Sequence, residues 1–213
     1  MRKRIKRIVK ITGVSLCAIV LVVVAAAAGS RIHGQHEAAL ALTIQTPSGI
    51  VEAGFQSIGG IEQWIQIRGE NRDNPVLLFL HGGPSVSMLP FTYRSMRVWE
   101  KQFTIVHWDQ RGAGRTYTRN GGAVSAATGI DQLVADGLDV AEFARQRLQK
   151  RKIILVGESF GTVIGTEMAR RRPDLFYAYV GTGQIVNMAK TQTVGYRLLK
   201  ERIHAAGDVK TMA

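Results

Sequence analysis

The chain has 213 residues, of which 46% are hydrophobic and 21% charged, and its net charge is +12. This length suits one domain with a sizeable core and an additional segment, and the composition is ordinary for a globular protein. Six basic and no acidic residues lie among the first ten and account for half of the net charge. The other basic residues do not form a face interleaved with aromatic residues, so we exclude nucleic-acid binding. The single cysteine, Cys17, excludes an intrachain disulfide.

An apolar segment without charged residues covers residues 11–29, directly after the basic N-terminus. A helix of this length extends about 28 Å, close to the hydrocarbon thickness of a bilayer. We therefore predict that residues 1–30 form a basic flank and a transmembrane anchor, with the flank in the cytoplasm and the domain extracytoplasmic. The alternative is a signal peptide cleaved near "AAAAGS", which leaves the domain secreted. Residues 31–48 are predicted to be a linker.

The following segment predicts an α/β domain with a mostly parallel sheet. Residues 50–58 and 61–68 are expected to form two strands joined at Gly59-Gly60. From residue 75 onward, apolar runs typical of strands buried on both faces alternate with helical segments. The runs are "NPVLLFL", "FTIVHW", "KIILVG" and "FYAYVGTG". Helices are expected within residues 87–101, 129–150, 160–172 and 193–207, and a glycine-rich loop over 112–129.

Three unusual loops follow strands of this sheet: "HGGPS" over 81–85, "DQRGAGRT" over 109–116 and "GESFG" over 157–161. Ligands of open α/β sheets bind beyond the carboxyl ends of the strands, so we expect these loops to border one site.

The loop "GESFG" lies between a strand and a helix, which is the arrangement of a nucleophile elbow. Ser159 is therefore predicted to be a catalytic nucleophile, with a structural turn serine as the alternative. The backbone N–H of Phe160, at the start of the helix, is a candidate donor to a substrate oxyanion. Glu158 and Gly161 complete the turn on either side of Ser159. The small glycine neighbours of the motif leave room for the serine.

The loop "HGGPS" supplies candidates for the second oxyanion donor. Gly82 and Gly83 let the backbone approach a substrate, Pro84 fixes the turn, and we expect the N–H of Gly83 to donate. His81 is interpreted as a residue that organises the loop, with a catalytic base as the weaker alternative.

In "DQRGAGRT", Asp109 and Arg111 are expected to pair and to brace a structural loop at the border of the site. Asp109 as the acid of a catalytic triad is disfavoured, because the elbow plan places that acid after the serine.

The motifs "HGGPS", "WDQRGAGRT" and "GESFGT" together resemble the proline iminopeptidase (prolyl aminopeptidase) branch of the α/β-hydrolase fold, over about residues 50–185. That family reads HGGPG, DQRGxGxS and GxSxG in this order. The resemblance implies a serine hydrolase with Ser159 as nucleophile and Gly83 and Phe160 in the oxyanion hole. Ser85 replaces the last glycine of HGGPG. Glu158 and Phe160 stand where the best-known prolyl enzymes carry Gly and Trp, and the form "GESFG" is similar to a secreted branch that removes longer N-terminal pieces.

The partners that would activate Ser159 are expected to lie outside this chain. A triad of this fold continues with an acid and then a histidine. The only histidine after Ser159 is His204, which we interpret as a surface residue of a helix. The acidic residues after Ser159 are Glu167, Asp174, Glu201 and Asp208. We therefore expect residues 49–187 to be the N-terminal part of a hydrolase core, residues 188–213 to begin an incomplete helical cap, and the truncated chain to have little or no turnover.

The sequence thus predicts a membrane-anchored serine hydrolase that releases N-terminal proline or short N-terminal pieces from peptides. The alternatives are an esterase or amidase for small molecules and a catalytically inert fragment. "GTGQIV" over 181–186 begins like a dinucleotide-binding motif, but Val186 replaces the third glycine, so we discount nucleotide binding. We expect no cofactor, and no metal, because the histidines are scattered.

Overall fold

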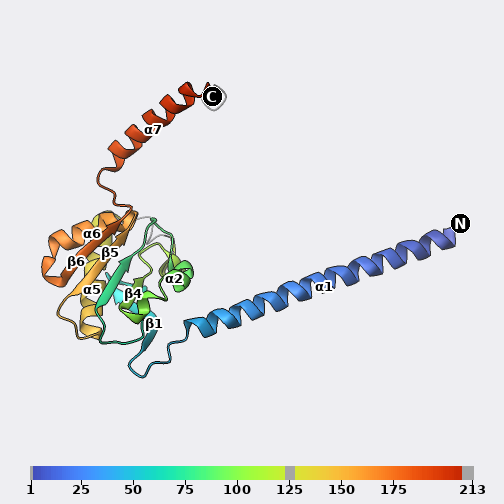
Figure 1. The fold of residues 1–213 in the computed structure, drawn as a ribbon, viewed down its shortest axis with the longest axis horizontal. Coiled ribbons are helices and arrows are strands. Elements are labelled where there is room, and N and C mark those ends of the chain that lie inside the picture. The colour runs from blue at the N-terminus through green and yellow to red at the C-terminus, as the bar shows by residue number, and fades with distance from the viewer. Residues whose placement is uncertain (1, 123–127, 208–213) are drawn as a thin grey trace. The chain divides into compact units, whose positions relative to one another are not determined.

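A computed structural model describes residues 2–122 and 128–207, and it divides into the units Met1–Thr43 and Ile44–Ala213. The first unit is a single uninterrupted helix, α1 (Arg2–Leu42) (Figure 1). Its segment Ser15–Leu42 is long and apolar enough to cross a membrane, judged by length and composition. The helix includes residues 31–42 of the predicted linker, because alanine, leucine, glutamine and glutamate in this stretch are strong helix formers.

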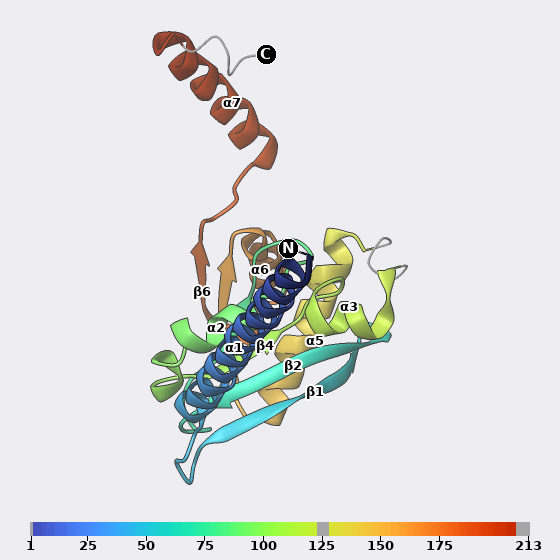
Figure 2. The ribbon, with the colours of Figure 1, turned by 90° about the vertical axis from the view of Figure 1, so that its right-hand side faces the viewer.

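The second unit is built on a six-stranded sheet with the order β1-β2-β4-β3-β5-β6. β1 and β2 form an antiparallel hairpin, and β2 also pairs antiparallel with β4 (Figure 2). The other neighbours are parallel, which confirms the α/β class with a mostly parallel sheet. The strands are β1 (Ile50–Ile58), β2 (Ile61–Gly69), β3 (Val76–Leu80), β4 (Thr104–Trp108), β5 (Ile153–Glu158) and β6 (Phe176–Thr182).

The main core lies on the sheet face that packs against α5 (Ile130–Arg147) and α6 (Phe160–Arg171). Strand side chains such as Leu78, Leu80 and Leu155 meet buried residues of both helices there. The opposite face carries a smaller cluster around Phe79 and Ile105, against residues next to α2 (Leu89–Ser95) and η1 (Trp99–Lys101). The strands β3 and β4 are buried on both faces, as continuous apolar runs predict.

Several predicted boundaries differ from the structure. The helix expected within residues 87–101 is divided into α2 and η1. The loop expected over 112–129 contains the short helix α3 (Gly114–Asn120), and a 3-10 turn, η2 (Pro173–Leu175), precedes β6. The last helix, α7 (Met188–Ala205), begins earlier than expected, because Asn187 caps it by accepting a hydrogen bond from the N–H of Lys190.

Candidate active site

Ser159 occupies a single-residue turn between the end of β5 at Glu158 and the start of α6 at Phe160. Its backbone has φ 49° and ψ −117°, a conformation that residues other than glycine rarely adopt. The side chain is exposed, whereas Glu158 and Phe160 on either side are half-buried. The sequence motif therefore folds into a sharp strand-to-helix turn that presents the hydroxyl of Ser159 to solvent.

The turn closes only because the neighbouring positions lack side chains. A Cβ atom added to Gly157 would lie 2.8 Å from the carbonyl oxygen of Gly161. A Cβ atom added to Gly161 would lie 2.2 Å from the carbonyl oxygen of Leu80, at the end of β3. Non-bonded carbon and oxygen atoms do not approach this closely, so a side chain at either position would push α6 away from the sheet. The two glycines therefore allow α6 to begin directly against the sheet.

The loop "HGGPS" lies beside the serine. A Cβ atom added to Gly82 would lie 3.2 Å from Cβ of Ser159 and 3.8 Å from its Oγ. Gly83 has φ 133°, and its peptide bond to Pro84 is cis. The structure thus brings two of the three predicted loops together and puts the backbone at Gly82 next to the nucleophile. The donor role of the Gly83 N–H stays a prediction.

His81 is buried between this loop and the loop after β4. Its Nδ1 lies 2.6 Å from the carbonyl oxygen of Gly82, and its Nε2 accepts the N–H of Gln110 at 3.3 Å. The ring satisfies both contacts only as the neutral tautomer with the proton on Nδ1. Burial lowers the pKa of His81 below its usual value, and this outweighs the opposing effects of the Gly82 carbonyl and the Asp109 carboxylate. Both ring nitrogens thus contact loop backbone.

Asp109 does not pair with Arg111, so that expectation is wrong. The Asp109 carboxylate accepts hydrogen bonds from the hydroxyl of Ser87 and, at 2.8 Å, from the N–H of Arg115. Gly114 lies so close that an added Cβ would sit 2.2 Å from Oδ2 of Asp109. The carboxylate therefore binds its own loop, through Arg115, and the segment after "HGGPS", through Ser87.

Arg111 instead binds Asp136, a fully buried residue of α5. Its Nε donates to Oδ2 of Asp136 at 2.8 Å, and its Nη2 donates to Oδ1 at 3.1 Å. The amides of Gln63 and Gln132 also donate to the two carboxylate oxygens, each at 2.8 Å. The indole N–H of Trp108 donates to the Gln63 side chain at 2.8 Å. The partner of Arg111 thus lies in α5, on a separate element from the loop that carries Arg111.

The candidate triad partners after Ser159 are not brought to it. His204 is exposed on α7, Glu167 pairs with Arg170, and Asp174 pairs with Arg172. Glu201 lies 3.9 Å from Arg197, and Asp208 falls outside the described residues. Within residues 2–122 and 128–207, no cluster of three metal-ligating side chains is present.

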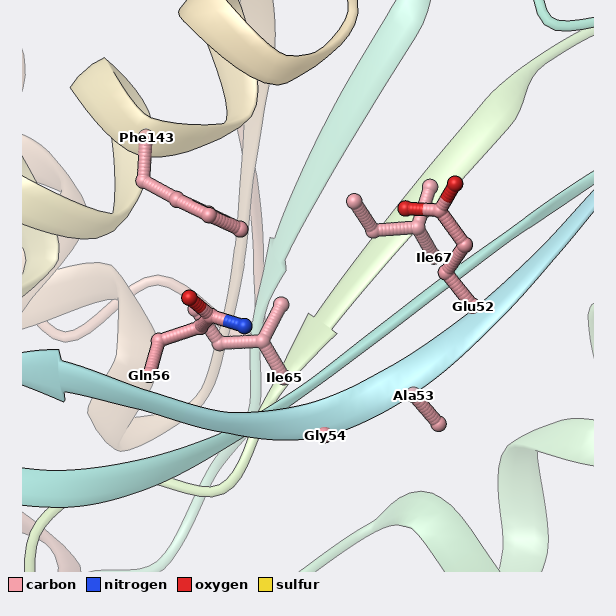
Figure 3. A pocket seen from close by; sticks show the side chains of 7 residues that line it. All are labelled: Glu52, Ala53, Gly54, Gln56, Ile65, Ile67 and Phe143. Atoms are coloured by element: carbon pink, nitrogen blue, oxygen red, sulfur yellow. The ribbon is translucent and has the colours of Figure 1, made fainter.

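A hollow elsewhere in the domain is lined by β1, β2 and α5 (Figure 3). Its lining residues are Glu52, Ala53, Gly54, Gln56, Ile65, Ile67 and Phe143. None of them belongs to the three loops, so this hollow is not where the chemistry predicted for Ser159 would occur.

Sequence reasoning missed two residues that shape the site, Asp136 and Thr162. Asp136 interrupts the buried stripe of α5, lying next to buried Gly137 and two positions from buried Val134. A carboxylate on such a stripe signals a buried partner, because an unpaired buried charge is too costly. Thr162 is fully buried in the first turn of α6 and directly follows the last letter of the elbow motif. The sequence gives no signal for the partners of the Thr162 hydroxyl, because a threonine at the start of a helix is common and its contact with Ile185 is distant in sequence.

The sequence of residues 73–207 matches the family described as "Serine aminopeptidase, S33". A probable aminopeptidase of Bacillus subtilis, YbaC, is 35% identical over 145 residues, which are 68% of this chain and 45% of that protein. The crystal structure of a proline iminopeptidase-related protein from Thermus thermophilus superposes with a TM-score of 0.55 and 28% identity, covering 65% of this chain and 46% of the other.

An epoxide hydrolase of Vigna radiata also superposes, with a TM-score of 0.50 and 24% identity over 62% of this chain and 38% of its own, and shares the fold. The chain spans less than half the length of each of these proteins. The matched residues contain all three loops of the candidate site. The chain belongs to the S33 serine aminopeptidase family of α/β-hydrolase fold proteins.

Proposed function

We propose that the site around Ser159 is that of a serine hydrolase acting on the N-termini of peptides, releasing proline or short N-terminal pieces. The observation that carries this proposal is the backbone of Ser159, held at φ 49° between β5 and α6 with its side chain exposed. Such strain persists where the surrounding structure enforces it, and it is typical of functional positions. The family and the aminopeptidase descriptions of its relatives support the substrate class.

In the proposed reaction, Oγ of Ser159 attacks the carbonyl carbon of the substrate while its proton passes to a histidine base. The negative charge that develops on the substrate oxygen is stabilised by the N–H groups of Phe160 and Gly83. Collapse of this intermediate expels the amine, which takes the proton from the base, and leaves an acyl-enzyme. A water molecule then attacks the acyl carbon while the base takes its proton, and collapse of the second intermediate releases the acid and returns the proton to Oγ of Ser159.

The base and the orienting acid are proposed to come from residues outside this chain. Two observations support this: His204 is exposed on α7, and the buried ring of His81 has both nitrogens against loop backbone. The chain also spans less than half of its relatives. On this proposal, residues 1–213 alone have little or no turnover.

The position of the protein is proposed from α1. Its apolar segment crosses a membrane as an uncleaved anchor, and the basic flank keeps the N-terminus in the cytoplasm. The domain is then extracytoplasmic, where it meets extracellular or periplasmic peptides.

Labelling with a fluorophosphonate probe tests the proposal, because the probe reacts only with an activated serine. Two preparations are compared: residues 1–213 and the longest product of the same gene, each beside its Ser159→Ala variant. We expect the longest product to be labelled at Ser159 and to hydrolyse proline aminoacyl amides, and residues 1–213 to be inert. If the isolated chain of residues 1–213 is labelled at Ser159, the proposal that the base and the acid lie outside this chain is contradicted. Absence of labelling in every product of the gene would contradict the hydrolase itself.

A further inference from the structure

We infer that Thr162 and residues 182–185, which are the last residue of β6 and the segment after it, hold the backbone of the nucleophile and act as positioning elements for Ser159. This segment is called the β6 loop below. The inference rests on the proposed role of Ser159 and extends the site beyond the three sequence motifs. Neither Thr162 nor the β6 loop belongs to the elbow pattern G-x-S-x-G.

Both backbone groups of Ser159 are held by these elements. Its N–H donates to the carbonyl oxygen of Thr182 at 2.9 Å. Its carbonyl oxygen accepts the N–H of Thr162 at 2.9 Å and the Thr162 hydroxyl at 2.6 Å. The strained backbone at position 159 is therefore fixed from one side by the end of β6 and from the other by the first turn of α6.

The hydroxyl of Thr162 connects these two sides to each other. It has one hydrogen, which it donates to the carbonyl oxygen of Ser159, and it accepts the N–H of Ile185 at 3.0 Å. Thr162 is fully buried, so water does not compete for either bond. One side chain thus ties the nucleophile residue to the β6 loop, more than twenty positions later in the chain.

A second set of contacts keeps the β6 loop against α6. The Tyr179 hydroxyl lies 2.9 Å from Oε1 of Gln184 and 3.2 Å from the carbonyl oxygen of Thr162. The Gln184 amide donates to the Thr166 hydroxyl at 3.3 Å. Gly183 has φ 58°, and a Cβ atom added there would lie 3.8 Å from the nitrogen of Ser159. The segment "GTGQ", which resembles the start of a dinucleotide motif, therefore passes along the backbone of the nucleophile.

These contacts give the strained turn the over-determined surroundings that it requires. Without the Thr162 hydroxyl, the carbonyl oxygen of Ser159 loses one of its two donors, and the β6 loop loses the bond from Ile185 to α6 while keeping the one from Gln184 to Thr166. The Ser159 backbone is then free to relax, and Oγ moves away from the oxyanion donors. Small displacements of a nucleophile lower the rate of the chemical step more than the affinity for the substrate.

The test compares Thr162→Val, which keeps the shape and removes the hydroxyl, with Thr162→Ser, which keeps the hydroxyl. Amide hydrogen exchange is measured on residues 1–213 in detergent micelles. We expect exchange at Ser159 and Ile185 to become about tenfold faster in Thr162→Val and to stay near the wild-type rate in Thr162→Ser. Amides of β3 and β5 serve as internal controls and should not change. Unchanged exchange at both residues in Thr162→Val would overturn the inference.

A second variant, Tyr179→Phe, keeps the test open if Thr162→Val does not fold. It removes only the hydroxyl that holds Gln184, so we expect a smaller acceleration, about threefold, at Ile185. If exchange at Ile185 stays at the wild-type rate in a folded Tyr179→Phe protein while Thr162→Val is unfolded, the inference is overturned.

The functional arm uses the longest product of the gene. Thr162→Val should lower kcat and the rate of fluorophosphonate labelling about tenfold with little change in KM, and Thr162→Ser should restore both. A Thr162→Val enzyme with wild-type kcat would show that the contacts are structural only. If wild-type Ser159 does not react at all, the proposed function fails, while the exchange experiment still decides whether Thr162 fixes the backbone.

Discussion

The elbow at Ser159 and the loop after β4 both lie against the loop "HGGPS" but are held by different interactions. The elbow is held by backbone contacts that the missing side chains of Gly157 and Gly161 permit. The loop after β4 is held by charged and polar side chains, above all the pair of Arg111 with Asp136. One relies on close packing around glycine, and the other on a buried network whose polar atoms are paired.

The difference determines how each loop tolerates change. A glycine-based turn fails when any side chain is added, because a backbone carbonyl of a neighbouring strand cannot move aside. A charge-based loop fails when one partner is removed, because the other remains buried and unpaired. The following experiments separate the two modes, beginning with the largest expected effect.

Asp136→Ala removes the carboxylate at the centre of the network and leaves the Arg111 guanidinium without its partner. We expect the free energy of unfolding to fall by about 3–5 kcal/mol, the usual cost of breaking a buried ion pair. Urea unfolding followed by tryptophan fluorescence measures this. The matched control is Asp139→Ala, an exposed position on the same helix, which should change stability by less than about 0.5 kcal/mol. Equal effects at the two positions would contradict a network role for Asp136.

Acidification probes His81, which lies between the loop "HGGPS" and the loop after β4, and His107 of β4. Burial is the main cause that lowers the pKa of both rings, that of His107 to about 4. Between pH 6.5 and these lowered values the unfolded chain binds more protons than the folded chain. The free energy of unfolding therefore has its full value above pH 6.5 and decreases as the pH falls. Titration of His107 alone lowers it by about 3 kcal/mol by the time pH 4 is reached.

Urea unfolding at a series of pH values measures this decrease. The variant His107→Leu has no titrating ring at this position, so its stability should depend less on pH over the same range. A variant with the wild-type pH dependence would show that His107 is not responsible.

Gly161→Ala introduces a Cβ atom that would lie 2.2 Å from the carbonyl oxygen of Leu80. We expect a loss of about 2 kcal/mol in the free energy of unfolding, as for other overpacked sites. Gly195→Ala is the control, because nothing lies within 4 Å of that position in α7. If Gly161→Ala is as stable as the wild type, the turn does not depend on the missing side chain.

Ser85→Gly changes the residue at which the chain departs from the motif HGGPG. Ser85 has φ 67°, which is strained for serine and unstrained for glycine. The relief is partly offset by the greater freedom of glycine in the unfolded chain, so we expect a gain of about 0.5 kcal/mol. Gln149→Gly, with φ 53° outside the site, is the matched control and should gain a similar amount. Thermal unfolding of the two variants in parallel checks the pair, and a loss of stability in Ser85→Gly would show that the serine side chain makes a compensating contact.

The elbow was predictable because its determinants are adjacent in sequence. Glycines on either side of Ser159, an apolar run before it and a helical pattern after it are all readable within about twenty residues. The alternation of strands and helices and the mostly parallel sheet followed from buried apolar runs that alternate with helical segments. The extension of α1 through residues 31–42 was missed, because charged and small residues there suggested a linker although their helix propensity is high.

The loop after β4 was not predictable in the same way. Arg111 has an acidic residue two positions away, and its true partner lies twenty-five positions later on another element. Asp109 finds Ser87, which precedes it by twenty-two positions. Pairing of charges depends on which elements the fold brings together, and proximity in sequence does not report it. The same reason hid the contact between Thr162 and Ile185.

The edge position of β6 has a consequence for handling the protein. β6 pairs with β5 on one side, and its seven residues contain no charge and no proline. Tyr177 and Val180 are exposed along it. Natural sheets protect such edges with charges, bulges or covering segments, because an open row of N–H and C=O groups recruits strands from other molecules. Concentrated solutions of residues 1–213 should therefore self-associate through this strand, and a lysine introduced at position 180 should keep them monomeric.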